Sequence, residues 1–358
     1  MNKWKQIARI GSLMSLILVM VGCSGVSQQT TDRIGGNDGI NQLQQLTKVK
    51  VAIDNGPAEV GIFLGDHLGY FAEQGIAIEP VKFPSGPDML LALASEQIDV
   101  TRGVINAGLF NAYARGIDVK LVADGGHNDP LSPYYSIVIA KSLEGKVKDY
   151  KDLKGLRIGI ANEGSINEIF LAQALEKGGL TMQDIEKVII DSFPDLTTAI
   201  ANGAVDAVIQ LEPLITQGLK NGTYALFKNP VEYAPEEQLA ILMYGKRMMK
   251  DKELGNRFMV AYLKGIRAYH EAIISGDKNR EQVIDILTQY TFVNDKELYA
   301  QMNKPLLDPD GTILKKGIEN DQNYYFENQL IKQKVDVGQM IDNSYIEAAL
   351  KVIGPYEQ

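Results

Sequence analysis

From Val49 onward, short apolar runs alternate with segments in which apolar residues recur at helical spacing. The short runs are typical of buried strands and the longer segments of amphipathic helices. The predicted strands cover residues 49–53, 76–83, 98–100, 119–123, 134–140, 156–161, 187–191, 206–210 and 239–245. The predicted helices cover about 59–73, 87–95, 106–114, 166–177 and 196–201, and the chain after 246 is mainly helical. This alternation predicts an α/β fold, with mostly parallel sheets flanked by helices.

A faint repeat divides this pattern into two halves. The stretch LALASEQIDV at 91–100 resembles TAIANGAVDAVI at 198–209. Each has a helix end, a polar turn and a buried strand that begins with an aspartate, Asp99 or Asp206. Two similar units predict two lobes of like construction. The alternative is a coincidence of turn residues that are common in α/β proteins.

The N-terminus has the pattern of an export signal. A positive segment at 3–9 precedes an apolar run from Ile10 to Val21, which is shorter than the ~20 residues of a membrane span. Gly22 and then Cys23 follow, which resembles the bacterial lipobox, with Met20 in place of the usual leucine. We therefore predict that residues 1–22 are a signal peptide and that Cys23 is acylated. The alternative is an uncleaved anchor helix with an incidental cysteine.

Lipidation would place the mature protein outside the cytoplasm, anchored to a membrane by acyl chains that contribute about 0.8 kcal/mol per buried methylene. Cys23 is the only cysteine, so disulfides, cysteine-ligated zinc and a cysteine nucleophile are excluded from the rest of the chain. Residues 23–48 are mostly polar and are predicted to form a lipid-anchored flexible tether.

Composition narrows the function further. The net charge is −9, and loss of the positive signal segment would make it about −12. An acidic protein lacks the basic face that nucleic acids require, so we expect no nucleic-acid partner. The ~310 residues after the tether suit one large domain or two lobes, and we expect a monomer.

Candidate binding residues lie in the loops that follow the predicted strands. In open α/β sheets, ligands bind beyond the C-terminal ends of strands, where helix N-termini offer free N–H groups. The loops are 54–59, 84–88, 101–106, 125–130, 162–165, 192–195 and 211–213. Ordinary helix capping explains each loop taken alone; Ser165 and Glu168, for example, have capping-box spacing. The functional interpretation depends on all of them converging on one cleft.

Charged residues in these loops leave the ligand open. Arg102 is their only arginine, the residue that grips carboxylates and phosphates through two bonds, but it is equally placed to pair with Asp99 or Asp124. His127 is the one histidine in a candidate loop, and it either touches ligand or has a structural role. The histidines are too far apart to suggest a metal triad, and no GxSxG, Walker or HExxH motif is present. We therefore expect no catalytic residue, metal or cofactor.

Four stretches carry a family resemblance: YFAEQGI, FPSGPDMLLALASEQIDV, NEGSINEIFLAQAL and AIANGAVDAVIQLEP. They resemble the solute-binding lipoproteins of ABC importers for sulfonates, taurine, nitrate and thiamine-pyrimidine precursors. The resemblance covers roughly 49–222 and implies a type II periplasmic-binding-protein fold, in which two lobes joined by two hinge strands close on ligand. The expected lobes are 49–137 with 240–358, and 138–239.

The resemblance also assigns binding positions, and this chain departs from the family pattern at some positions. Its binding loops correspond to the following residues of this chain: Asp54, Asn55, Ser85, Gly86, Thr101, Arg102, Asn106, Gly164, Ser165 and Glu212. To these we add His127 from its own loop. Leu211 replaces the aromatic residue of many sulfonate binders, and the sole tryptophan, Trp4, lies in the signal, so no tryptophan lines the cleft.

The expected function is capture of a small organic solute or oxyanion outside the cytoplasm and its delivery to an ABC permease in the membrane. Tyr134 and Tyr135, beside the first hinge, either stack on an organic ligand or pack the hinge. The rivals are a sensory binding protein that reports ligand to a receptor or kinase, a scaffold without ligand, and an enzyme. Thiamine-pyrimidine synthases resemble the family but use a cysteine cluster, which this chain lacks.

Overall fold

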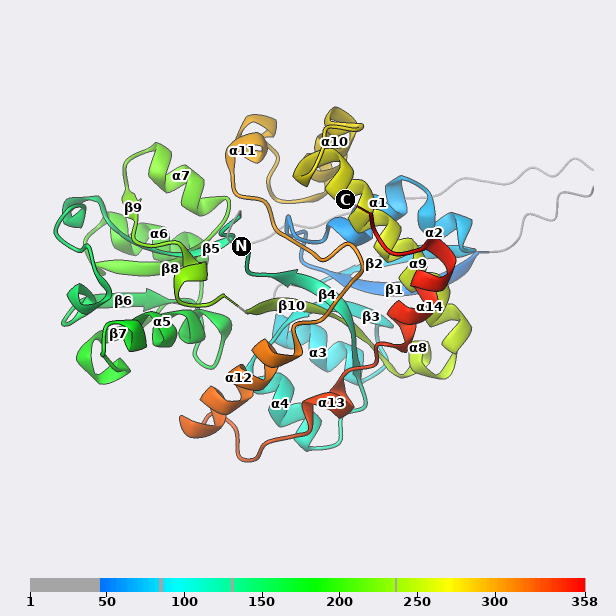
Figure 1. Cartoon of the computed structure of the whole chain (residues 1–358), viewed down its shortest axis with the longest axis horizontal. Coiled ribbons are helices and arrows are strands. Elements are labelled where there is room, and N and C mark those ends of the chain that lie inside the picture. The colour runs from blue at the N-terminus through cyan, green and yellow to red at the C-terminus, as the bar shows by residue number, and fades with distance from the viewer. Residues whose placement is uncertain (1–45, 84–85, 130–131, 236, 358) are drawn as a thin grey trace, which may run out of the picture. The chain divides into compact units, whose positions relative to one another are not determined.

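A computed structural model describes residues 46–83, 86–129, 132–235 and 237–357. The predicted signal peptide, Cys23, most of the tether and Ser85 lie outside the described residues. The described chain is an α/β protein with two five-stranded sheets (Figure 1). No helix in these ranges is long and apolar enough to cross a membrane.

The first sheet has the strand order β2-β1-β3-β10-β4. Its strands are β1 (Thr47–Ile53), β2 (Ile76–Lys82), β3 (Val100–Val104), β4 (Lys120–His127) and β10 (Gln238–Tyr244). Parallel pairing joins β1 to β2 and β3, whereas β10 runs antiparallel between β3 and β4. Strand β10 therefore returns to this sheet after the whole second sheet has been built.

The second sheet has the order β7-β6-β8-β5-β9. Its strands are β5 (Tyr135–Ala140), β6 (Arg157–Ile160), β7 (Glu186–Ile189), β8 (Ala207–Leu211) and β9 (Tyr224–Leu226). Here β5 runs antiparallel between β8 and β9. Each sheet is thus mixed, with one reversed strand among otherwise parallel ones, and that strand stands next to a crossover between the sheets.

The two sheets share one construction, as the sequence repeat predicts. A carboxylate oxygen of Asp99 accepts a hydrogen bond from the backbone N–H of Lys50 at 2.9 Å, which fastens β3 to β1. Asp206 accepts the equivalent bond from Arg157 at 2.9 Å, which fastens β8 to β6. Each aspartate also pairs with an arginine, Arg247 or Arg157. The repeated aspartate therefore has a structural role in both halves.

Helices cover both sheets. The helices are α1 (Val60–His67), α2 (Tyr70–Glu73), α3 (Gly86–Ala94), α4 (Ala107–Ala114), α5 (Ile166–Lys177), α6 (Phe193–Ala201), α7 (Leu214–Lys220), α8 (Lys246–Lys250), α9 (Lys252–Tyr269), α10 (Arg280–Tyr290), α11 (Lys296–Gln301), α12 (Lys315–Glu327), α13 (Val337–Met340) and α14 (Ser344–Ile353). Short 3-10 turns lie at 141–143, 150–153, 182–184 and 230–232, and a π-helical turn at 270–274 extends α9.

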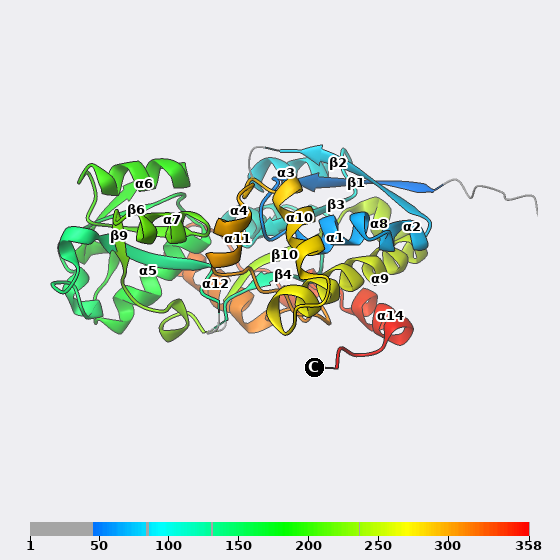
Figure 2. The ribbon, with the colours of Figure 1, turned by 90° about the horizontal axis from the view of Figure 1, so that it is seen from above.

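Helix α9 is the main support of the first sheet. It lies along α1 and α2 and also packs against α14 (Figure 2). The approach to α1 is close because a Cβ on Gly265 would stand 2.5 Å from the carbonyl oxygen of Gly61. Phe258, Tyr262 and Ile266 of α9 are fully or almost fully buried in the largest apolar cluster.

Three predicted elements differ from the structure. The helix predicted over 59–73 is two helices, because Gly69 has a φ of 80° and ends the first one. Residues 101–104, predicted as a loop, form most of β3, and the strand predicted to end at 123 continues to His127. In both cases the partner strand is β10, more than a hundred residues away, so local sequence held no sign of the pairing.

Asp99→Ala is expected to lower the free energy of unfolding by about 1 to 3 kcal/mol, because the backbone N–H of Lys50 and the guanidinium of Arg247 lose the buried carboxylate that accepts from both. Urea unfolding followed by circular dichroism measures the change. Glu357→Ala, which removes an exposed carboxylate near the C-terminus, is the control and should unfold like the wild type. Equal stability of the two variants would contradict the role assigned to Asp99.

Candidate ligand-binding site

Arg102 and two tyrosines form the centre of the candidate site. Arg102 comes from β3, and Tyr134 and Tyr135 come from the end of the first crossover and the start of β5. The arginine charge is close enough to act on both phenols, and Asp54, at the end of β1, acts on them as well. Burial raises the pKa of Tyr135 to about 12, so the phenol stays a neutral hydrogen-bonding group.

The guanidinium of Arg102 keeps much of its hydrogen-bonding capacity. Its Nε donates to the carbonyl of Gly125 at 2.5 Å, and the arginine forms no ion pair with any residue the structure describes. Both of the carboxylates proposed as its partners are taken elsewhere, since Asp99 pairs with Arg247 and Asp124 with His127. A half-buried arginine with free N–H groups is suited to an anionic ligand group.

Glu59 is a second buried titratable group in this region, and sequence analysis left it out of the site. Its side chain is only 2% exposed; one oxygen accepts from the N–H of Asp54 at 3.0 Å, and the other is buried without a partner. Burial, with the charge of Asp54, raises its pKa well above the usual value despite the nearby Arg102. Its position in the loop between β1 and α1 was the sequence feature that could have identified Glu59 as a site residue.

An aromatic wall adjoins the tyrosines on the side of the second sheet. The ring of Tyr135 stacks on Phe170 of α5 with centroids 6.1 Å apart and meets the edge of Phe193 at 6.2 Å. Tyr134 meets Tyr135 edge to face at 5.6 Å. Tyr134 is buried, whereas Tyr135 is half-buried. Tyr135 therefore packs against aromatic residues of the second sheet and lies within electrostatic reach of Arg102.

The loop after β1 is held in an unusual shape. Asn55 has a φ of 60°, in the left-handed region that asparagine tolerates better than most residues. Its side-chain amide donates to the carbonyl of Tyr290 at 2.5 Å, and its carbonyl accepts from Phe292 at 2.9 Å. Asp54 is exposed and accepts the N–H of Gly56 at 2.7 Å. Of the two predicted binding residues in this loop, Asp54 has an exposed carboxylate, whereas the side-chain amide of Asn55 is used to fix the loop.

The residues predicted from β3 and α4 have different surroundings. Thr101 is 1% exposed and its hydroxyl lies against the sulfur of Met89 at 3.4 Å, so it faces the core. Because it has no open hydroxyl, we drop Thr101 from the proposed contacts. Asn106 caps α4 by accepting the N–H of Leu109 at 2.8 Å. Gly86 begins α3.

The loop before α5 meets α4 directly. The carbonyl of Gly164 accepts the first N–H of α4, from Ala107, at 3.0 Å, so that donor is not free for a ligand here. Ser165 is the N-cap residue of α5, but its hydroxyl donates to the carbonyl of Asn162 at 2.6 Å instead of capping. The predicted capping box is wrong, because Glu168 accepts from the N–H of Gly164 at 2.7 Å and pairs with Lys187.

His127 belongs to a buried polar network centred on Asp124. The carboxylate of Asp124 contacts a ring nitrogen of His127 at 2.7 Å, accepts from Gln238 at 2.6 Å, and accepts the N–H groups of Gly126 and Asp308 at 2.7 and 2.6 Å. Asp124 is completely buried. His127 is thus positioned by β4 and β10, and its bond to Asp124 helps to hold the ends of these strands together beside the crossovers.

The carboxylate of Glu212 is also hydrogen-bonded within the protein. It is fully buried and accepts the backbone and hydroxyl donors of Thr216 at 3.0 Å and the backbone and amide donors of Asn303 at 3.0 and 2.8 Å. These bonds join the start of α7 to the segment after α11. We therefore replace the predicted ligand contact with a structural role, since the carboxylate faces protein donors on every side that the structure describes.

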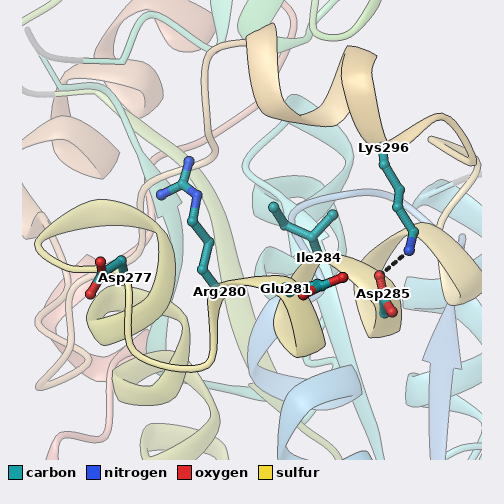
Figure 3. A pocket seen from close by; sticks show the side chains of 6 residues that line it. All are labelled: Asp277, Arg280, Glu281, Ile284, Asp285 and Lys296. Carbon is teal, nitrogen blue, oxygen red and sulfur yellow. Dashed lines mark ion pairs between the residues drawn. The ribbon is translucent and has the colours of Figure 1, made fainter.

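A surface hollow of about 410 Å³ lies away from these residues, along α10 (Figure 3). Its lining is mostly charged, and Lys296 forms an ion pair with Asp285 across it (Figure 3). It contains no aromatic side chain and none of the predicted binding residues. The hollow is not the site that the strand ends build. No group of three or more His, Cys, Asp or Glu residues within the described ranges is arranged to hold a metal ion.

His127 and His270 are expected to titrate on opposite sides of the usual value of about 6.5. Burial lowers the pKa of His127, but the hydrogen bond and charge of Asp124 outweigh it and raise the pKa overall. Burial lowers the pKa of His270, which contacts the carbonyl of Leu307. The stabilising charge on His127 is therefore complete below about pH 6.5 and is lost as the pH rises through the raised value.

Proton NMR of the imidazole C–H groups against pH measures both midpoints, with His127→Gln and His270→Gln for assignment. Asp124→Asn should bring the His127 midpoint down and lower the unfolding free energy by about 2 to 4 kcal/mol, because an amide N–H₂ would face buried donors. A His127 midpoint at or below that of His270 would contradict the assignment.

Comparison with known proteins gives the family. Residues 57–272 match the family described as NMT1/THI5 like. A Bacillus subtilis protein assigned as an aliphatic sulfonates-binding protein is 25% identical over 95% of this chain and 96% of its own length. A 4-amino-5-hydroxymethyl-2-methylpyrimidine phosphate synthase of Schizosaccharomyces pombe is 27% identical over 44% of this chain and 42% of its own.

The fold has solved counterparts. The crystal structure of the periplasmic aliphatic sulphonate binding protein SsuA from Escherichia coli superposes with a TM-score of 0.68. The alignment covers 82% of this chain and 97% of that one, at 22% identity. At this identity the likeness shows the fold, which agrees with the two-sheet architecture expected from the resemblance. Because the family match spans more than half of the sequence, this chain belongs to the NMT1/THI5-like family.

Proposed function

We propose that this protein is the extracytoplasmic solute-binding component of an ABC importer and that it captures a small organic anion of the sulfonate type. The observation that carries the proposal is Arg102, a half-buried arginine that forms no ion pair with any described residue and lies beside an aromatic pair. The B. subtilis relative, which aligns over nearly the whole chain, supports the ligand class.

Ligand recognition would use three kinds of group. Arg102 would bind the anionic head through its free N–H groups, and the half-buried ring of Tyr135 would contact the organic part. Asp54 brings a carboxylate to the same region and Glu59 a buried carboxyl group with a raised pKa, which favours a ligand that also carries a hydrogen-bond donor or a positive group. The site differs in this respect from one that selects a bare oxyanion such as nitrate.

Capture would proceed by movement of the two sheets about their crossovers. The chain passes from β4 to β5 once and returns from β9 to β10 once, and backbone bonds tie the two crossovers together, as between Asn128 and Glu237 at 2.9 Å. Arg102 stands on one sheet and Tyr135 on the other, so a ligand that contacts both favours the closed arrangement. The permease would recognise that closed form.

We further propose that the protein carries out no covalent chemistry. The partial relative that is a pyrimidine phosphate synthase leaves an enzyme as the rival. Against it, the whole sequence contains one cysteine, at position 23, so no cysteine cluster exists for such chemistry. Release of unchanged ligand after denaturation, identified by mass spectrometry, would support binding, whereas a converted product would favour the enzyme.

Membrane anchoring through Cys23 is a separate prediction. Full-length protein expressed in a bacterial host should partition into detergent and carry acyl chains on the cysteine, detected by mass spectrometry of the N-terminal peptide. Cys23→Ser should be unacylated and should leave the membrane fraction. Once the signal peptide is cleaved, the mature protein without lipid has no predicted anchor. A wild-type N-terminus without lipid would contradict the lipobox assignment.

Arg102→Ala is expected to weaken binding of an alkanesulfonate by about 10- to 100-fold, since a charge-assisted pair of hydrogen bonds is lost. Isothermal titration of protein from residue 24 onward, refolded to strip carried-over ligand, measures the affinity. The panel contains alkanesulfonates, taurine, nitrate and the thiamine pyrimidine. Arg102→Lys keeps the charge without the planar fork and should fall between wild type and alanine.

Arg115→Ala removes an exposed arginine that follows α4 and serves as the matched control, with unchanged affinity expected. Urea unfolding of each variant separates lost binding from lost stability, because Arg102 also bonds the carbonyl of Gly125. Binding of a sulfonate with the same affinity in Arg102→Ala and wild type would overturn the assigned site. Failure of every ligand in the panel would overturn the ligand class.

A further inference from the structure

Two carboxyl groups meet in the interior, away from the candidate ligand site. Glu237 directly precedes β10, at the end of the second crossover, and Asp321 lies in the middle of α12. Their side chains are 2% and 0% exposed. The two carboxyl groups are neighbours, and each acts on the pKa of the other. Since ionised carboxylates only accept hydrogen bonds, a direct bond between the two groups requires a proton on one of them.

The surroundings of the pair connect both halves of the molecule. Helix α12 packs on α4 and β10, which belong with the first sheet, and on α5, which covers the second (Figure 1). The amide of Gln173, from α5, donates to Glu237 at 3.2 Å. The backbone of Glu237 is in turn bonded to Asn128 of the other crossover at 2.9 Å. The pair therefore joins α5, α12 and the crossovers.

No described cation neutralises the pair. Apart from the bond of Gln173, the remaining oxygens, Oε1 of Glu237 and both oxygens of Asp321, are buried without a protein donor. Tyr325 on α12 is acted on by both carboxyl groups, and its hydroxyl is also buried without a partner among the described residues. Glu168 on α5 acts on Tyr325 but is paired with Lys187.

The titratable residues of α4 and β10 are engaged elsewhere. The hydroxyl of Tyr113 on α4 donates to the carbonyl of Gln339 at 2.9 Å. The hydroxyl of Tyr244 on β10 donates to the carbonyl of Gly255 at 2.9 Å. The charge state of the pair is thus decided by its burial and by the repulsion between its own two members.

We propose that Glu237 and Asp321 share one proton and act as a pH-sensitive latch. The protonated pair holds α5 and the second crossover against α12, and the contact loosens when the proton leaves at higher pH. Two adjacent buried carboxylates without a counter-ion repel each other and face a large desolvation penalty. Separation of the two ionised carboxylates and entry of water reduce both the repulsion and the desolvation penalty. Separation moves α12 away from the α5 side, which changes how the two sheets are held together.

The direction of the pH effect follows from burial. Burial raises the pKa of Glu237 to about 7, and burial together with the charge of Glu237 raises the pKa of Asp321 well above its usual value. Groups with raised pKa values in the folded state contribute stability that is complete below their unfolded values, near pH 4, and is lost as the pH rises through the folded values. The latch is therefore closed in acid and weakens from about neutral pH upward.

Infrared spectroscopy of ligand-free protein tests the shared proton directly. The wild type should show a protonated-carboxyl band at about pH 6 that titrates away toward about pH 9. Glu237→Gln with Asp321→Asn keeps the shape of the pair without a titrating proton, and the difference spectrum isolates the pair from other buried acids such as Glu59. If the double variant fails to fold, Asp321→Asn alone serves, because it removes the shared proton. An unchanged band in the variant would overturn the proposal.

Thermal unfolding and small-angle scattering over the same pH range test the latch. The wild type should lose melting temperature and expand as the pH rises, and the double variant should lose most of this dependence. Glu176→Gln with Glu327→Gln, which removes two exposed carboxylates from α5 and α12, is the matched control and should follow the wild type.

Two further outcomes are decisive. Equal pH profiles for wild type and the double variant would overturn the latch. A tightly bound metal ion, found by elemental analysis and removed together with the pH effect by a chelator, would show that a cation and not a proton balances the pair. These readouts need no ligand, so they stand whether or not the proposed transport function holds.

Discussion

Strand β10 is the contact on which the rest of this structure depends. It is inserted between β3 and β4, antiparallel to both, after the chain has built the whole second sheet. Without it the first sheet would be split, because β3 and β4 have no other pairing that joins them. The side chain of Gln238, at its first residue, donates to Asp124 and to the carbonyl of Gly126, which fixes the strand at the crossover end.

The same insertion positions the candidate site. Pairing with β10 extends β3 through Arg102, so the arginine lies on a rigid strand and not in a flexible loop. It also extends β4 to His127 and places Gly125, the acceptor of the Arg102 Nε, beside it. Tyr135 approaches from the second sheet, whose own reversed strand begins there. A binding group from each sheet is thus held at the point where the chain crosses between them.

The buried carboxyl groups differ in how many hydrogen-bond donors surround them. Asp124 is balanced by a histidine, an amide and backbone donors, and Glu212 by four donors from two residues. Glu237 and Asp321 have no such set of donors, and Glu59 keeps one oxygen without a partner. Satisfied carboxylates stabilise a single arrangement, whereas unsatisfied ones make an arrangement sensitive to protonation or to a ligand. The contrast separates the parts of the crossover region that are structural from those we propose to be functional.

The sequence by itself determined the α/β class, the two similar halves and most of the strands and helices, including α5 from 166 to 177, because apolar spacing and helix signals are local. It also pointed to Arg102 and to the tyrosines, since polar residues after strands gather at one edge of a sheet. Only the tertiary structure decided that residues 101–104 are a strand, that Thr101 faces the core and that Glu212 is enclosed by donors. Those outcomes depend on β10 and on Asn303, partners far along the chain, and the identity of a distant partner is not encoded in local spacing.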